Sequence, residues 1–234
     1  MTHTAAARSR GQASIGAAER DLPARWISWS AWAGIIGPLL FTATFLAQEA
    51  LRRDEYDPLA EPVSALEAGP NGWIQQLNFV AFGLLTIAFA IGLNRGLRPT
   101  RAGIVGPALL LLSGIGLLFA GTFPLREDTA GVTYDPGFHF VAGLTFFLSS
   151  ALGLIVVSRR LARDARWHGL ATCTLIAGIV ALAGFAVGAG FVVPDDAPLH
   201  DWAGLHQRLV VLVVIFPCRI VLSLRLLRVA NGRR

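Results

Sequence analysis

The chain has 234 residues, of which 54% are hydrophobic and only 15% are charged, and its formal net charge is +5. A soluble domain normally carries about 25% charged residues, and the apolar residues here gather in runs of about 20, the length that crosses roughly 30 Å of hydrocarbon. The composition therefore excludes a soluble globular domain and predicts an integral membrane protein. Both cysteines fall inside apolar runs, so neither a disulfide framework nor a CxxC motif is indicated.

The first segment, residues 1–25, is rich in Ala, Ser, Gly and Arg and has no apolar core, so we expect a disordered cytoplasmic tail rather than a signal peptide. The apolar runs that follow predict one all-α domain over residues 26–227, a six-helix transmembrane bundle, because a backbone in lipid must satisfy its own hydrogen bonds. Residues 228–234 are expected to form a basic cytoplasmic tail. The predicted helices are about 26–47, 73–93, 102–122, 137–157, 170–193 and 205–222.

The arginines predict the orientation of these helices. Sixteen of the twenty lie in the N-terminal tail, after the second and fourth runs, or at the C-terminal end. The positive-inside rule makes that side cytoplasmic, so we expect both termini inside the cell and the protein in the plasma membrane. Twelve of the fifteen acidic residues fall on the opposite, outer side, where they either solubilise the loops or attract cations and basic ligands. The positive charge thus lies beside the membrane and does not indicate a nucleic-acid partner.

Polar side chains gather at the predicted outer ends of the helices. Asp135 stands four residues before His139 at the start of the fourth run, where a carboxylate can cap the helix and can also orient the imidazole. Arg208, at the start of the sixth run, needs a carboxylate or carbonyl partner, for which Glu61, Glu67 and Asp135 are candidates. The candidate outer-face site comprises Ser64, Glu67, Gln75, Asn78, Asp135, His139, His206 and Arg208.

Several interpretations of this polar group stay open. It can be a vestibule that binds a lipid or small molecule, or a hydrogen-bonded plug that fixes helix packing. His139, His200 and His206 share the outer interface, and three histidines can hold zinc with an open position for water, which would make the protein a metal-dependent lipid hydrolase. No HExxH or similar spacing supports that alternative, and no phosphate-binding loop, dinucleotide glycine pattern or GxSxG motif indicates another reaction.

A small permease is the remaining alternative. It needs a polar path past mid-membrane, and the sequence shows no row of intramembrane acids. Arg219 lies deeper in the sixth run and is expected to snorkel toward the cytoplasmic interface.

Four segments of the chain follow one another in a familiar order. They are YDPLAEPVSALEAGPNGWIQQLNFVAFG (56–83), AGTFP (120–124), the histidine at 139, and GLHQR (204–208). Together they resemble the bacterial and archaeal multi-pass membrane family called domain of unknown function 998, over about residues 30–222. That resemblance implies no activity, and where some members carry an acid after the position of Ser64, this chain has Ala65.

A looser likeness connects the chain with the Frag1/DRAM/Sfk1 membrane proteins, through an outer P-x-S loop, six helices and a histidine at an outer helix start. It would imply lipid handling. We therefore expect a multi-pass membrane protein whose partners are the lipid bilayer and a lipid or small molecule bound at the outer face.

Overall fold

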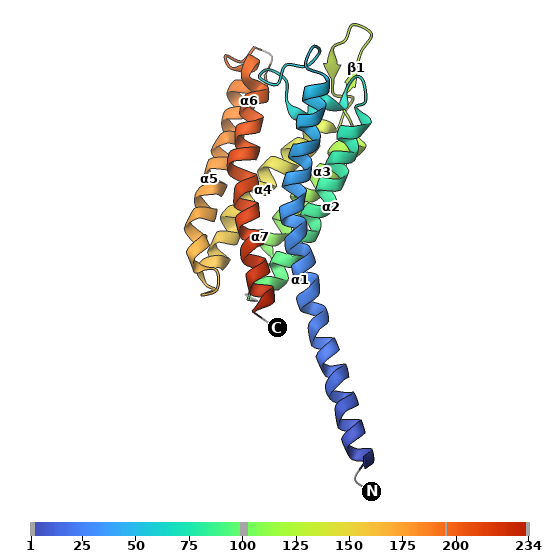
Figure 1. Cartoon of the computed structure of the whole chain (residues 1–234). Coiled ribbons are helices and arrows are strands. Elements are labelled where there is room, and N and C mark those ends of the chain that lie inside the picture. The colour runs from blue at the N-terminus through green and yellow to red at the C-terminus, as the bar shows by residue number, and fades with distance from the viewer. Residues whose placement is uncertain (1–2, 99–102, 195, 233–234) are drawn as a thin grey trace.

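Six long helices dominate the fold (Figure 1). The computed structural model describes residues 3–98, 103–194 and 196–232, with side chains from Arg25 onward. In this part of the chain, six helices are long and apolar enough to cross a membrane, which confirms the predicted all-α bundle: Arg25–Leu51, Trp73–Gly96, Val105–Thr122, His139–Ala162, His168–Val192 and His200–Asn231.

The elements include short 3₁₀ segments (η1, η2, η4) and two π-helical segments (η3, η5). In chain order they are α1 (His3–Leu51), η1 (Val63–Glu67), α2 (Trp73–Gly96), α3 (Val105–Thr122), β1 (Arg126–Glu127), β2 (Thr133–Tyr134), α4 (His139–Ala162), η2 (His168–Leu170), α5 (Ala171–Val187), η3 (Gly188–Val192), η4 (His200–Trp202), α6 (Ala203–Arg208), η5 (Leu209–Ile215) and α7 (Phe216–Asn231). The antiparallel β1–β2 hairpin was not expected from the sequence.

The helix boundaries differ from the expected ones mainly at the basic end. Helix α1 begins at His3, within the segment expected to be a disordered tail, and the proposed tail boundaries stay a prediction. The expected start of the third helix, residue 102, lies outside the described residues. Helices α4 and α7 continue to Ala162 and Asn231, because arginines near their ends bind backbone carbonyl groups of neighbouring segments.

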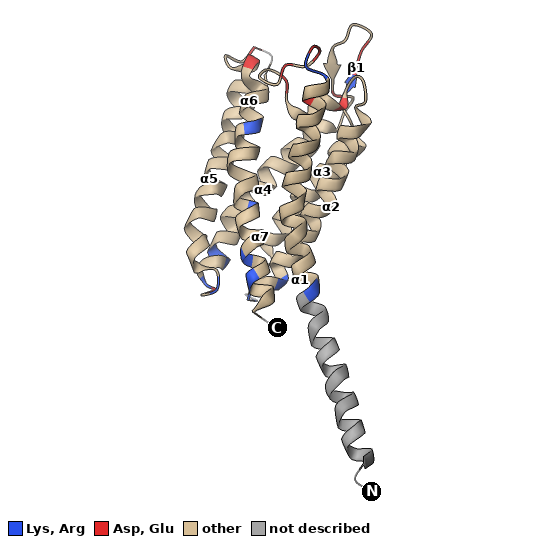
Figure 2. Cartoon of the chain, viewed as in Figure 1, with Lys and Arg blue, Asp and Glu red and all other residues tan. Residues whose placement is uncertain are grey.

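The six helices form a ring in which each packs against its neighbours in the chain, and α7 returns to pack against α1. One end of the ring, here the loop end, carries the longer connections α1–α2, α3–α4 and α5–α6, and the other is the turn end. Figure 2 shows that Asp and Glu residues gather at the loop end and that most of the described arginines lie at the turn end. Glycines allow close approach: a Cβ on Gly83 would lie 2.8 Å from the carbonyl oxygen of Gly114, so α2 and α3 touch through their backbones.

Arg160 organises the turn end. Its guanidinium donates to the carbonyl oxygens of Leu97 (3.0 Å) and Gly103 (2.8 Å) and to the Asn94 side chain (2.7 Å), which satisfies free carbonyl groups at the end of α2. Beside it, hydrogen bonds and the charge of Arg166 hold the pKa of Asp164 at about 2. The turn end is therefore fixed by polar contacts.

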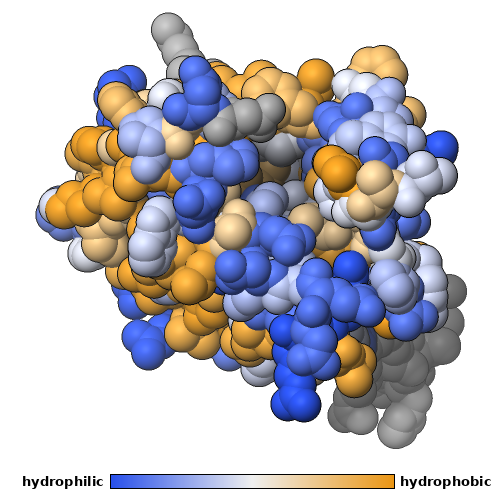
Figure 3. Space-filling model, turned by 90° about the horizontal axis from the view of Figure 1, so that it is seen from above, coloured by the Kyte–Doolittle hydropathy of each residue, from blue (hydrophilic) through white to orange (hydrophobic). Residues whose placement is uncertain are grey.

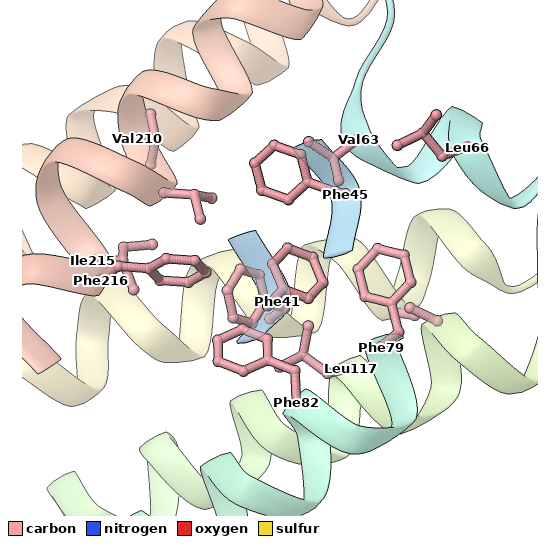
Figure 4. Packing of buried hydrophobic residues seen from close by; sticks show 14 of the residues in the cluster. Phe41, Phe45, Val63, Leu66, Phe79, Phe82, Leu117, Val210, Ile215 and Phe216 are labelled. Carbon is pink, nitrogen blue, oxygen red and sulfur yellow. The ribbon is translucent and has the colours of Figure 1, made fainter. Parts of the chain in front are cut away.

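The core of the loop-end half is aromatic (Figure 4). The rings of Phe41, Phe82 and Phe216 come from α1, α2 and α7, and their centroids lie 4.9 Å (Phe41–Phe82), 5.1 Å (Phe82–Phe216) and 6.0 Å (Phe41–Phe216) apart. Such offset and edge-to-face pairs add about 0.5–1.5 kcal/mol each beyond burial. We call these three rings the aromatic floor, because a cavity lies directly on them.

Candidate functional site

A cavity of about 1260 Å³ opens between the helices at the loop end. Its base is the aromatic floor, and η3 and η5 form part of its wall, through Gly188, Val192, Val210 and Val211. Polar and charged residues of the loops line its mouth, and Figure 3, a view onto this end, shows polar groups around a hollow. Drug-sized pockets occupy about 300–1,000 Å³, so this cavity has room for a molecule with a long apolar part.

Asp135 caps α4, as the sequence predicts. One carboxylate oxygen accepts the backbone N–H groups of Gly137 (2.8 Å) and His139 (3.2 Å), and the other accepts that of Phe140 (2.7 Å). Partial burial works to raise the pKa of Asp135, but the three N–H bonds and the neighbouring His139 together lower it. The carboxylate therefore holds the backbone of the helix start and leaves the imidazole of His139 to another partner.

Replacing Asp135 by alanine should destabilise the protein by about 1–2 kcal/mol, because free N–H groups at the start of α4 lose their acceptor. Since the folded-state pKa is lowered, this stabilisation is present above the unfolded pKa of an aspartate and is lost as the pH falls through the folded value. Denaturant titration in detergent at neutral and acidic pH measures both effects. The exposed Asp54→Ala change is the control and should stay within about 0.5 kcal/mol of the wild type.

The partner of the His139 ring is Glu67, at the end of η1. Nδ1 lies 3.0 Å from Oε2 of Glu67 and 3.2 Å from the carbonyl oxygen of Phe123. The Glu67 side chain is 0% exposed, and its Oε1 has no partner among the described residues. Burial raises the pKa of the Glu67 carboxyl, while the hydrogen bond and charge of His139 work to lower it. A buried acid thus orients a histidine that lines the cavity.

Arg208 joins three segments of the loop end. Its guanidinium pairs with Glu49 near the end of α1, and it donates to the Tyr56 hydroxyl (2.6 Å) and to the carbonyl oxygen of Glu61 (3.0 Å). It also lies 5.9 Å from the ring centre of Phe45. Burial raises the pKa of the Tyr56 phenol, so the hydroxyl stays protonated. It donates a hydrogen bond to the Glu61 carbonyl oxygen. All three nitrogens of the Arg208 guanidinium group therefore donate hydrogen bonds within the protein, and the side chain holds these segments together.

The carboxylate partner of Arg208 was not among the three expected ones. Glu61 contributes only its carbonyl oxygen, Glu67 is paired with His139, and Asp135 caps α4. The partner is Glu49, 159 positions earlier in the chain. The signal that could have found Glu49 is its place inside a membrane-length helix, where an acidic residue needs a partner.

Gln75 and Asn78 form a plug between α1 and α2 rather than part of the cavity wall. The Asn78 amide donates to the carbonyl oxygen of Phe41 (3.0 Å) and to Gln75 (3.1 Å), which also accepts from Gln48 (3.0 Å). Neither Gln75 nor Asn78 lines the cavity. Gln75 and Asn78 thus fit the interpretation as a hydrogen-bonded plug, whereas Ser64, Asp135, His139, His206 and Arg208 all line the cavity.

The three histidines proposed as zinc ligands have separate partners. His139 is held by Glu67, His200 lies 3.3 Å from the carbonyl oxygen of Val192, and His206 packs against Gly188. In the described chain, no group of three or more histidine, cysteine or acidic side chains is placed to hold a metal ion. A zinc site on these residues stays a prediction without geometric support.

Arg219 does not snorkel as expected. It is buried in the bundle, and its guanidinium carbon lies 5.0 Å and 5.1 Å from the ring centres of Phe82 and Phe89. Its Nε and Nη2 have no hydrogen-bond partner within the described ranges. The faces of the two rings attract the guanidinium group, which lies between the two hydrophobic clusters to which Phe82 and Phe89 belong.

The fold and the cavity define a multi-pass helical membrane protein with a large pocket at its loop end. The chain belongs to the family described as "Protein of unknown function (DUF998)", whose model matches residues 35–222. No curated protein and no solved structure matches the chain. The likeness to Frag1/DRAM/Sfk1 proteins stays a prediction.

Proposed function

We propose that this protein binds a lipid or a similar amphipathic small molecule in the loop-end cavity. The observation that carries the proposal is the combination of volume and lining. An aromatic floor and valine-rich wall suit an apolar chain, and a mouth of charged and polar groups suits a head group. Among the described residues, the floor is apolar and the mouth is polar. The cavity would therefore bind the apolar end of a ligand at the floor and its polar end at the mouth.

We place the protein in the plasma membrane, with the loop end outside and both termini in the cytoplasm. The distribution of arginines supports this orientation, since 15 of 20 fall in the two terminal segments and around the connections at the turn end. Reporter fusions at either terminus test it: a cytoplasmic reporter should be active at both ends, and an active periplasmic or extracellular reporter would contradict the orientation.

Filling the cavity is the direct test of binding. Gly143 on α4 lines the cavity, and a Cβ placed there meets no atom within 4 Å. Gly143→Trp should therefore fold, occupy the volume above the floor and reduce the lipid that copurifies with the protein by about tenfold or more. Mass spectrometry measures the bound lipid per chain in two preparations: protein that is gently extracted with its lipid, and protein that is delipidated and then reloaded.

Gly190→Trp is the matched control. Gly190 is also free of neighbours within 4 Å but does not line the cavity. It should keep wild-type lipid content and a wild-type unfolding temperature. Equal lipid content in both variants, or a wild type that retains only annular lipid exchanging freely with the bilayer, would refute the proposal.

A further inference from the structure

One wall of the cavity presents hydrogen-bond donors that have no protein acceptor. Oε1 of Gln207 accepts the backbone N–H of Val63 (2.7 Å), which fixes the orientation of the amide and directs Nε2 elsewhere. Nε2 finds no acceptor within the described ranges, and Gln207 lines the cavity. The hydroxyl of Ser64, the next residue of η1, also lines the cavity and makes no hydrogen bond with the described residues.

His139 adds a third donor to this wall. Both neighbours of Nδ1 are acceptors, so Nδ1 carries a hydrogen, and Nε2 has no partner in the described part of the protein. When Glu67 is ionised, its charge favours the doubly protonated ring, because a buried carboxylate needs a cation beside it. In that state Nε2 also carries a hydrogen and can donate it to a molecule in the cavity.

The short helix η1 brings these donors together. Gln207 contacts its first residue, Val63, and His139 contacts its last, Glu67, with Ser64 between them. At about 2.0 Å rise per residue the two contact points are about 8 Å apart along the backbone, and Ser64, His139 and Gln207 all line the same cavity. A group with several acceptor oxygens, such as a phosphodiester, matches this wall.

The mouth has the opposite polarity. Glu55, Glu127 and Asp201 are exposed there, and none of them forms an ion pair with a described residue. Two arginines also line the cavity: Arg208 is already paired with Glu49, and Arg52 donates to the carbonyl oxygens of Leu66 and Ala68. The mouth therefore attracts a cation, whereas a free anion would meet unpaired carboxylates first.

From this order of donors and charges, we propose that the ligand is a zwitterionic phospholipid or lysophospholipid. Its phosphate would lie at η1, its amine or choline group at the mouth, and its acyl chain on the aromatic floor. The inference rests on the proposed function and adds the class of head group to it.

Competition experiments on the purified wild type test the head group. Native mass spectrometry compares lysophosphatidylcholine, lysophosphatidic acid and a monoacylglycerol of the same chain, together with free phosphocholine. We expect lysophosphatidylcholine to bind about tenfold or more tightly than the other three, because only it has a phosphate, a cation and a chain. Tight binding of phosphocholine alone would identify a soluble ligand and overturn the lipid assignment.

Two near-isosteric variants address the donors. His139→Asn keeps a donor near the position of Nδ1 for Glu67 and removes Nε2, and Gln207→Glu keeps the acceptor for Val63 and removes the donor. Each should lower the preference for lysophosphatidylcholine over the monoacylglycerol by about tenfold. An unchanged preference in both variants would overturn the phosphate position.

Neutralising the mouth addresses the cation. The triple variant Glu55→Gln, Glu127→Gln, Asp201→Asn should lose the preference for lysophosphatidylcholine over lysophosphatidic acid. Its control, Asp54→Asn with Asp196→Asn, changes acids of the same end that do not line the cavity and should keep that preference. If the wild type binds lysophosphatidylcholine and monoacylglycerol equally, the head-group inference fails and the proposed function survives. If it binds neither, both fail.

Discussion

Replacing Arg208 by methionine should cost about 3–5 kcal/mol of unfolding free energy, the largest loss that we expect from a single substitution here. The change leaves the Glu49 carboxylate without its cation in a position where both side chains are largely buried, 11% and 13% exposed. It also removes the donors to Tyr56 and to the Glu61 carbonyl group. Denaturant titration in mixed detergent micelles measures the unfolding free energy.

Two comparisons separate the charge from the volume of the side chain. Glu49→Gln combined with Arg208→Met removes both charges, so the double variant should be more stable than Arg208→Met alone. Arg53→Met changes an arginine whose side chain is 82% exposed and should have an effect within about 0.5 kcal/mol. A loss below about 1 kcal/mol in Arg208→Met would show that the Arg208–Glu49 pair contributes no more to stability than an exposed ion pair does.

The number and order of the helices could be predicted from the sequence because hydrocarbon imposes one simple rule. A backbone that crosses lipid must bond to itself over about 20 apolar residues, and each such run here became a helix. The ends were less predictable where arginine is concerned. A helix predicted from its apolar residues ends before Arg160 or Arg225. Helices α4 and α7 nevertheless continue past these residues, and each arginine donates to a backbone carbonyl oxygen of a neighbouring segment.

The end of the bundle at which the candidate residues lie could be predicted, but their contacts could not. The sequence places Ser64, His139 and Arg208 at one end of the bundle, and all three line one cavity. Which acid meets which base depends on helix rotation and on the path of the loops, and no local pattern encodes either. Glu67 and Asp135 are both close to His139, but only the fold shows that one binds the ring and the other the backbone.

The Glu67–His139 pair gives the second large expected effect. Glu67→Leu should destabilise the protein by about 2–4 kcal/mol, because it leaves the imidazole facing an apolar side chain and the Leu125 N–H without its acceptor. The same variant should also weaken binding of a phosphate-bearing lipid, because the ring loses the carboxylate that favours its second proton. Unfolding titrations and lipid competition on one preparation measure both effects.

A double-mutant cycle assigns this loss to the pair itself. Glu67→Leu, His139→Leu and the double variant should give a coupling free energy of about 1–3 kcal/mol, since the double variant has neither an unpaired acid nor an unpaired base. Glu67→Gln keeps an acceptor for Nδ1 without the charge, so it should fold better than Glu67→Leu while lipid binding stays weak. Wild-type lipid binding in Glu67→Gln would mean that the carboxylate only holds the ring in place, and a coupling near zero would mean that the two side chains act independently.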